Sequence, residues 1–77
     1  MAIQHRVLVI GVGSIGERHL RCFLQTGRVD AEFVEVNPTL RETIAGRYPA
    51  AQPHATLEAA LASKPDVAVI CTPAQLH

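Results

Sequence analysis

Three glycines near the start of the chain have the spacing of a phosphate-binding turn. Gly11, Gly13 and Gly16 follow an apolar run directly and fit the pattern G-x-G-x-x-G. In such a turn the first glycine permits the bend, the second lets a diphosphate approach the backbone, and the third lets the next helix pack closely on the strand. The amides near Ser14 and Ile15, at the positive end of the helix dipole, would point at the phosphates. These residues therefore predict a dinucleotide site.

A second feature of such a site is a ribose-binding acid about 20 residues beyond the glycines. Glu35 and Asn37 compete for that position, but Asn37 followed by Pro38 is a good helix N-cap, which places the strand tip at Glu35. A carboxylate there can accept hydrogen bonds from both ribose hydroxyls and would repel a 2′-phosphate, so Glu35 favours NAD over NADP. A solvated strand-end charge is the alternative interpretation. Arg41 could attract a 2′-phosphate, although an exposed helix charge describes it equally.

The elements that must position these residues follow from the apolar pattern. It predicts strands over 6–10, 31–35, a short one within 50–55, and 67–72, and helices over 14–26, 38–47 and 57–63. Such alternation predicts an α/β fold: a partial Rossmann fold with a parallel sheet of about four strands in the order 3-2-1-4 and helices on both faces. Ligands bind such sheets at the switch point between strands one and four, where Gly11 and Thr72 are expected.

Several side chains are expected to face inward. The first helix should bury a stripe at helical spacing, formed by Ile15, His19, Cys22 and Phe23 and widened by Leu20 and Leu24. The third helix should turn Leu57, Ala60 and Leu61 towards the sheet. Cys22 and Cys71 fit no metal or redox spacing and are expected to be reduced, buried thiols. His5 and His54 are expected near strand starts, away from the ligand.

The bulk composition excludes several function classes. The chain has 77 residues and a formal net charge of zero, so it predicts one small domain without a basic face for nucleic acid. It has no apolar run of the ~20 residues that a membrane helix needs and no leader-like amino terminus, so a cytoplasmic protein is expected. No His, Cys and acid cluster has metal-ligand spacing.

The carboxyl-terminal residues carry a second motif. Thr72-Pro73-Ala-Gln-Leu-His77 fits Thr-Pro-x-x-x-His, and together with the stretch 11–19 it resembles the Gfo/Idh/MocA family over the whole chain. The resemblance implies oxidoreductases that pass a hydride between a nicotinamide and a sugar, cyclitol or related polyol. It implies that Gly11, Gly13, Ser14, Ile15 and Gly16 hold the diphosphate, that Glu35 holds the adenosine ribose, and that Thr72, Pro73 and His77 border the nicotinamide half.

The chain also departs from the family pattern. The ribose acid is Glu rather than the commoner Asp, and the family's Glu-Lys-Pro motif, whose Lys assists proton transfer, does not occur in residues 1–77. We therefore expect the amino-terminal part of a dinucleotide-binding domain, without the substrate domain, without a catalytic residue and inactive alone. An open edge at the fourth strand invites pairing, so association of copies is expected.

Two other functions fit part of the pattern. A regulatory domain that binds NAD without catalysis would use the same glycine turn, but the Thr-Pro-x-x-x-His ending counts against it. A methyltransferase that binds S-adenosylmethionine also has a glycine-rich first turn and an acid after its second strand. That class does not usually need all three glycines at this spacing, and the sequence favours it least.

Overall fold

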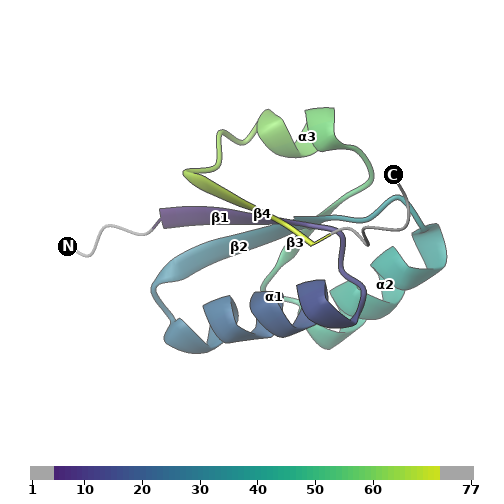
Figure 1. Ribbon diagram of the computed structural model, residues 1–77, viewed down its shortest axis with the longest axis horizontal. Coiled ribbons are helices and arrows are strands. Elements are labelled where there is room, and N and C mark those ends of the chain that lie inside the picture. The colour runs from purple at the N-terminus through teal and green to yellow at the C-terminus, as the bar shows by residue number, and fades with distance from the viewer. Residues whose placement is uncertain (1–4, 72–77) are drawn as a thin grey trace.

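The computed structural model describes residues 5–71, in which strands and helices alternate (Figure 1). The strands are β1 (His5–Ile10), β2 (Val29–Val34), β3 (Gln52–His54) and β4 (Val67–Ile70), and the helices are α1 (Ser14–Thr26), α2 (Pro38–Arg47) and α3 (Leu57–Leu61). All pairings are parallel and the sheet order is β3-β2-β1-β4. The α/β class and the order 3-2-1-4 are therefore confirmed.

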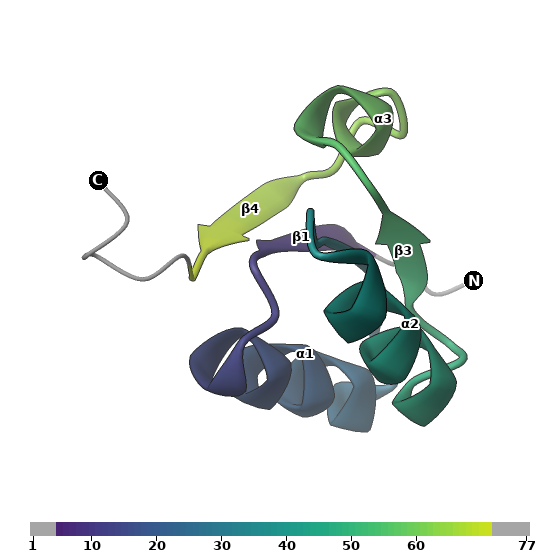
Figure 2. The same cartoon turned by 90° about the vertical axis from the view of Figure 1, so that its right-hand side faces the viewer.

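The helices cover both faces of the sheet. Figures 1 and 2 show α1 and α2 on one side and α3 on the other. The larger core joins the sheet to α1 and α2, with Phe33, Leu20 and Ile44 each at 0% exposure. A smaller core lies under α3 and includes Leu8 and Ala60. Burial on both faces explains why the first strand is a continuous apolar run rather than an alternating one.

The helix ends follow local side-chain chemistry. The Asn37 side chain accepts hydrogen bonds from the amides of Thr39 and Leu40 at 3.0 and 3.1 Å, which caps α2. The Thr56 hydroxyl oxygen caps α3 in the same way. Gly27, with φ of 67°, closes α1 in the left-handed conformation that glycine adopts readily. The predicted cap at Asn37 is confirmed.

The predicted inward face of α1 is confirmed for Leu20, which is buried, and for Phe23 and Leu24, which pack against the larger core, but it was wrong at three positions. Ile15 is 63% exposed, and His19 and Cys22 are exposed as well. The buried residues of α1 are Gly16 and Leu20. The physical reason is the close approach of Gly16 to β1, which rotates the helix so that its contact face starts at residue 16 instead of residue 15. Cys22 is consequently not a buried thiol, whereas Cys71 is half-buried, and both cysteines are free.

The third helix is shorter than predicted and buries less. It ends at Leu61, so one turn reaches the sheet, and within it only Ala60 is buried, while Leu57 and Leu61 are 42% and 50% exposed. Two strands also differ in extent: β2 covers residues 29–34, which leaves Glu35 just beyond its end, and β4 ends at residue 70.

Candidate functional site

The glycine turn begins where β1 ends. Gly11 has φ of 86°, in the region that residues with a Cβ rarely adopt, and its amide donates to the Val34 carbonyl at 2.9 Å. Val12 follows with 1% exposure and packs in the larger core. The turn is therefore anchored on both sides, by a hydrogen bond to β2 and by a buried side chain.

Gly16 is the point at which α1 touches the turn. A Cβ built on Gly16 would lie 1.8 Å from the carbonyl oxygen of Gly11 and 3.4 Å from the Cβ of Cys71. Only glycine fits at such a distance. The third glycine of the motif therefore brings the helix against the strand, as the sequence predicted.

Gly13 faces open space instead. A Cβ built there would meet nothing within 4 Å. Gly13 is also the N-cap of α1 and has no side chain to cap the helix. Because glycine has no side chain, no N-cap side chain accepts hydrogen bonds from the amides of the first helical turn, which include those of the exposed Ser14 and Ile15. Open space in front of a helix N-terminus fits the phosphates of a dinucleotide.

Glu35 lies beside this turn and is held by two amides. Its Oε1 accepts a hydrogen bond from the Val12 amide at 3.1 Å and its Oε2 accepts one from the Asn37 amide at 3.0 Å. The Arg41 guanidinium donates to the Glu35 carbonyl oxygen at 2.9 Å. Each carboxylate oxygen has capacity for a further hydrogen bond, so the group can still accept from ligand hydroxyls.

The carboxyl ends of β1 and β4 lie next to each other. Ile10 pairs with Ile70, and the Cys71 amide donates to the Ile10 carbonyl at 2.8 Å. Burial raises the pKa of the Cys71 thiol, which disfavours its reactive thiolate form. The strand ends and the glycine turn thus form one edge, at the switch point of the sheet.

A polar cluster ties α1 to α2 beside the turn. Glu17, in the first turn of α1, accepts hydrogen bonds from Arg47 Nη1 and Tyr48 Oη, both at 2.9 Å. The hydrogen bond from Arg47, followed by the one from Tyr48, lowers the pKa of the Glu17 carboxyl group. The hydrogen bond between Tyr48 and Glu17 raises the pKa of the Tyr48 hydroxyl group. Arg47 thereby offsets the negative charge of Glu17 in the first turn of α1.

Sequence comparison identifies this arrangement. A family profile described as "Oxidoreductase family, NAD-binding Rossmann fold" (Gfo/Idh/MocA) matches residues 5–77. The chain belongs to this family. No curated protein sequence matches it significantly.

Solved structures of two dehydrogenases have the same fold as this family member. The chain is 25% identical to the WlbA dehydrogenase from Chromobacterium violaceum, with a TM-score of 0.79 over 96% of this chain and 22% of that one. It is 28% identical to the WlbA dehydrogenase from Bordetella pertussis, with a TM-score of 0.81 over 97% of this chain and 24% of that one. Both structures are complexes with NADH and UDP-GlcNAcA. The chain thus spans less than a quarter of either dehydrogenase.

The structure brings together most of the residues that the sequence indicated for this Gfo/Idh/MocA site. The predicted diphosphate set lies in one turn with Glu35 beside it; its members are Gly11, Gly13, Ser14, Ile15 and Gly16. Thr72, Pro73 and His77 fall outside the described residues, so their nicotinamide role stays a prediction.

Two residues near the site were misjudged or missed. His54 was expected near a strand start, but it ends β3, and its carbonyl oxygen accepts a hydrogen bond from the Glu35 amide at 3.1 Å. Its ring contacts Glu32, which is 5% exposed. The available signal was an acidic residue inside the apolar run of the second strand, a type that is rarely buried unless paired.

Two classes of feature do not occur in the described part of the chain. Residues 5–71 contain no group of three or more His, Cys, Asp or Glu side chains that could hold a metal ion. None of the helices described is both long and apolar enough to cross a membrane.

Proposed function

We propose that this chain is the amino-terminal, dinucleotide-binding part of an oxidoreductase that uses NAD and acts on a sugar, cyclitol or related polyol. The observation that carries the proposal is the position of Glu35, whose carboxylate is fixed against the glycine turn by the Val12 and Asn37 amides. Family membership supports the nicotinamide chemistry. The bound cofactor would supply the group that accepts or donates the hydride.

The assignment of ligand groups follows from the local geometry. The helix N-terminus behind Gly13 suits the diphosphate, and the carboxylate of Glu35 suits the two hydroxyls of the adenosine ribose. A 2′-phosphate would place negative charge against Glu35, which supports NAD as the preferred cofactor. Arg41 donates from Nη1 to the Glu35 carbonyl oxygen, which supports a structural role for this side chain rather than a role as a 2′-phosphate ligand.

The substrate class and the domain assignment rest on the comparisons. The two similar dehydrogenases were solved with a nucleotide sugar, which supports a sugar derivative as substrate here. The chain corresponds to less than a quarter of each, which supports its assignment as one part of a two-domain enzyme.

Calorimetric titration of the intact protein with NADH and NADPH tests the cofactor assignment. NADH is expected to bind at least tenfold more tightly. Glu35→Gln should weaken NADH binding by about 10- to 100-fold, the range for a hydrogen bond to a charged group, and should reduce the preference over NADPH. Glu42→Gln is the matched control, because Glu42 is an exposed acid of α2. Tighter binding of NADPH by the unaltered protein would refute the role of Glu35.

A further inference from the structure

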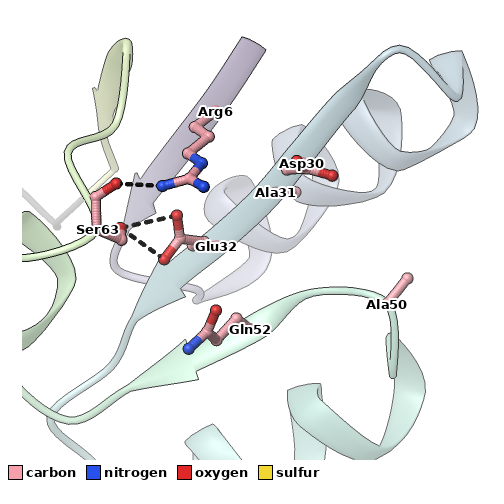
Figure 3. A pocket seen from close by; sticks show the side chains of 7 residues that line it. All are labelled: Arg6, Asp30, Ala31, Glu32, Ala50, Gln52 and Ser63. Carbon is pink, nitrogen blue, oxygen red and sulfur yellow. Dashed lines mark hydrogen bonds between the residues drawn. The ribbon is translucent and has the colours of Figure 1, made fainter. Parts of the chain in front are cut away.

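Glu32 is a buried carboxylate that the proposed function does not use. It lies in the middle of β2 and is 5% exposed. A buried carboxylate is costly unless its oxygens receive hydrogen bonds. Ser63 Oγ lies 2.9 Å from each carboxylate oxygen, and His54 Nε2 lies 2.7 Å from Oε1 (Figure 3 shows the Ser63 contacts). Ser63 Oγ, which also lies 2.7 Å from the Ala60 carbonyl oxygen, and His54 Nε2 can donate to these carboxylate oxygens.

A polar hollow of about 240 Å³ adjoins this carboxylate (Figure 3). Arg6, Asp30 and Gln52 line it together with Glu32 and Ser63. The Arg6 guanidinium donates to the Ser63 carbonyl oxygen, which fixes the segment after α3 against β1. Ser63 is therefore held both by Arg6, at its carbonyl oxygen, and by Glu32, at its hydroxyl group.

His54 links the buried carboxylate to the candidate ribose site. Its ring, with a side chain 10% exposed, contacts Glu32, and its carbonyl oxygen accepts the Glu35 amide proton. β3 has only three residues and pairs with β2 at the edge of the described sheet. The main chain thus holds β3 over a short stretch only, and the ring contact with Glu32 is a second attachment for His54.

We propose that the Glu32–His54 pair positions Glu35 for the adenosine ribose. This inference rests on the proposed function, since it assumes that Glu35 binds the ribose. The pair touches no ligand itself. The contact between Glu32 and the His54 ring fixes the position of the end of β3 relative to β2. The His54 carbonyl oxygen then fixes the position of the Glu35 main chain through its hydrogen bond with the Glu35 amide. From that position the Glu35 carboxylate accepts the hydrogen bond from the Val12 amide in the glycine turn.

The test compares two variants that each remove one hydrogen bond from the same carboxylate. His54→Leu removes the donor on β3, whereas Ser63→Ala removes the donor on the segment after α3, which has no link to Glu35. Unfolding in urea and calorimetric binding of ADP-ribose, which contains the adenosine and the diphosphate of the cofactor but no nicotinamide ring, are measured for both. Both variants should lose stability, but only His54→Leu should weaken ADP-ribose binding, by about tenfold. His54→Gln, which returns an amide donor, should restore part of the affinity.

The outcomes separate this inference from the proposed function. Equal weakening by Ser63→Ala, or unchanged affinity in His54→Leu, would overturn the positioning role. Unchanged ADP-ribose affinity in Glu35→Ala would instead overturn the ribose assignment itself. If His54→Leu does not fold, Glu32→Gln replaces it in the test. This substitution weakens the hydrogen bond between residue 32 and the His54 ring at nearly constant side-chain volume, and it should also lower the affinity for ADP-ribose.

Discussion

Gly16→Ala and Gly13→Ala are expected to separate folding from ligand binding within one motif. The two changes add the same methyl group three residues apart. At Gly16 the new Cβ lies 1.8 Å from the Gly11 carbonyl oxygen, so α1 must move by roughly 1.5 Å or more to reach an ordinary contact of about 3.5 Å. At Gly13 the Cβ meets nothing within 4 Å, and φ of −64° suits alanine.

The magnitudes follow from these contacts. Overpacking typically costs about 1–3 kcal/mol, and because the obstacle at Gly16 is backbone rather than a flexible side chain, we expect about 3 kcal/mol. That is a large part of the roughly 4–12 kcal/mol typical of a chain of 77 residues, and it corresponds to a fall in Tm of about 12–24 °C. Gly13→Ala should stay within about 0.5 kcal/mol, since its reduced freedom when unfolded offsets a slightly poorer cap.

Urea and thermal unfolding, each with and without NADH, measure both effects. At NADH 100-fold above its Kd the unaltered protein should gain about 2.7 kcal/mol. Gly13→Ala should gain much less, because its methyl group occupies the space assigned to the diphosphate. The reasoning would be refuted if the stability of Gly16→Ala were within about 1 kcal/mol of that of the unaltered protein. It would also be refuted if Gly13→Ala, measured without NADH, lost more than about 1 kcal/mol of stability relative to the unaltered protein.

Three further predictions concern stability alone. Asn37→Ala removes the cap of α2 and should cost about 1 kcal/mol in urea unfolding; no loss would show that the cap is dispensable. Lys64→Gly should raise stability by about 1 kcal/mol, because Lys64 has φ of 57° in the left-handed region, and a lower urea midpoint would contradict this. Hydrogen bonds from Arg47 and Tyr48 lower the folded pKa of Glu17 below its ordinary value of 4.5, so the stability that they provide is present above that pH and is lost as the pH falls through the folded pKa. Glu17→Gln should therefore destabilise the protein at pH 7 and progressively less below pH 4.5, and a constant difference in acid titrations would exclude this ion-pair account.

The features predicted correctly depend on short stretches of sequence. The glycine spacing and the Asn37 cap each involve neighbours within a turn, so residue types nearly determine them. The sheet order followed from the alternation of elements and the handedness of crossovers. Glu35 could be placed because the cap at Asn37 fixed where β2 must stop.

The face of α1 could not be read from periodicity. Two stripes differ by one residue: one contains Ile15 and His19, the other Gly16 and Leu20. The first looks more apolar at its start, because glycine has no side chain to count. The close approach of Gly16 to Gly11 decides between them, and that contact depends on the three-dimensional turn.

The Glu32–His54 contact was beyond the sequence for a different reason. It requires the register of β3 against β2, in which Val34 pairs with His54, and it requires the position of Ser63 after a helix that ends earlier than predicted. Neither quantity is set locally. In the sequence, Glu32 is only an acidic residue within an apolar strand.

The position of Cys71 beside Gly16 has a consequence for the order of assembly. The turn lies near the start of the chain, yet Cys71 lies beside it from the end of β4, which pairs with β1 and follows the other described elements in sequence. Contacts this distant in sequence form late, because a long loop must close first. We expect nascent chains that stop before β4, such as residues 1–64, to carry the complete glycine motif without NADH affinity, and tight NADH binding by such chains would contradict this. The turn is therefore encoded near the start of the chain but is completed only after β4 has been made.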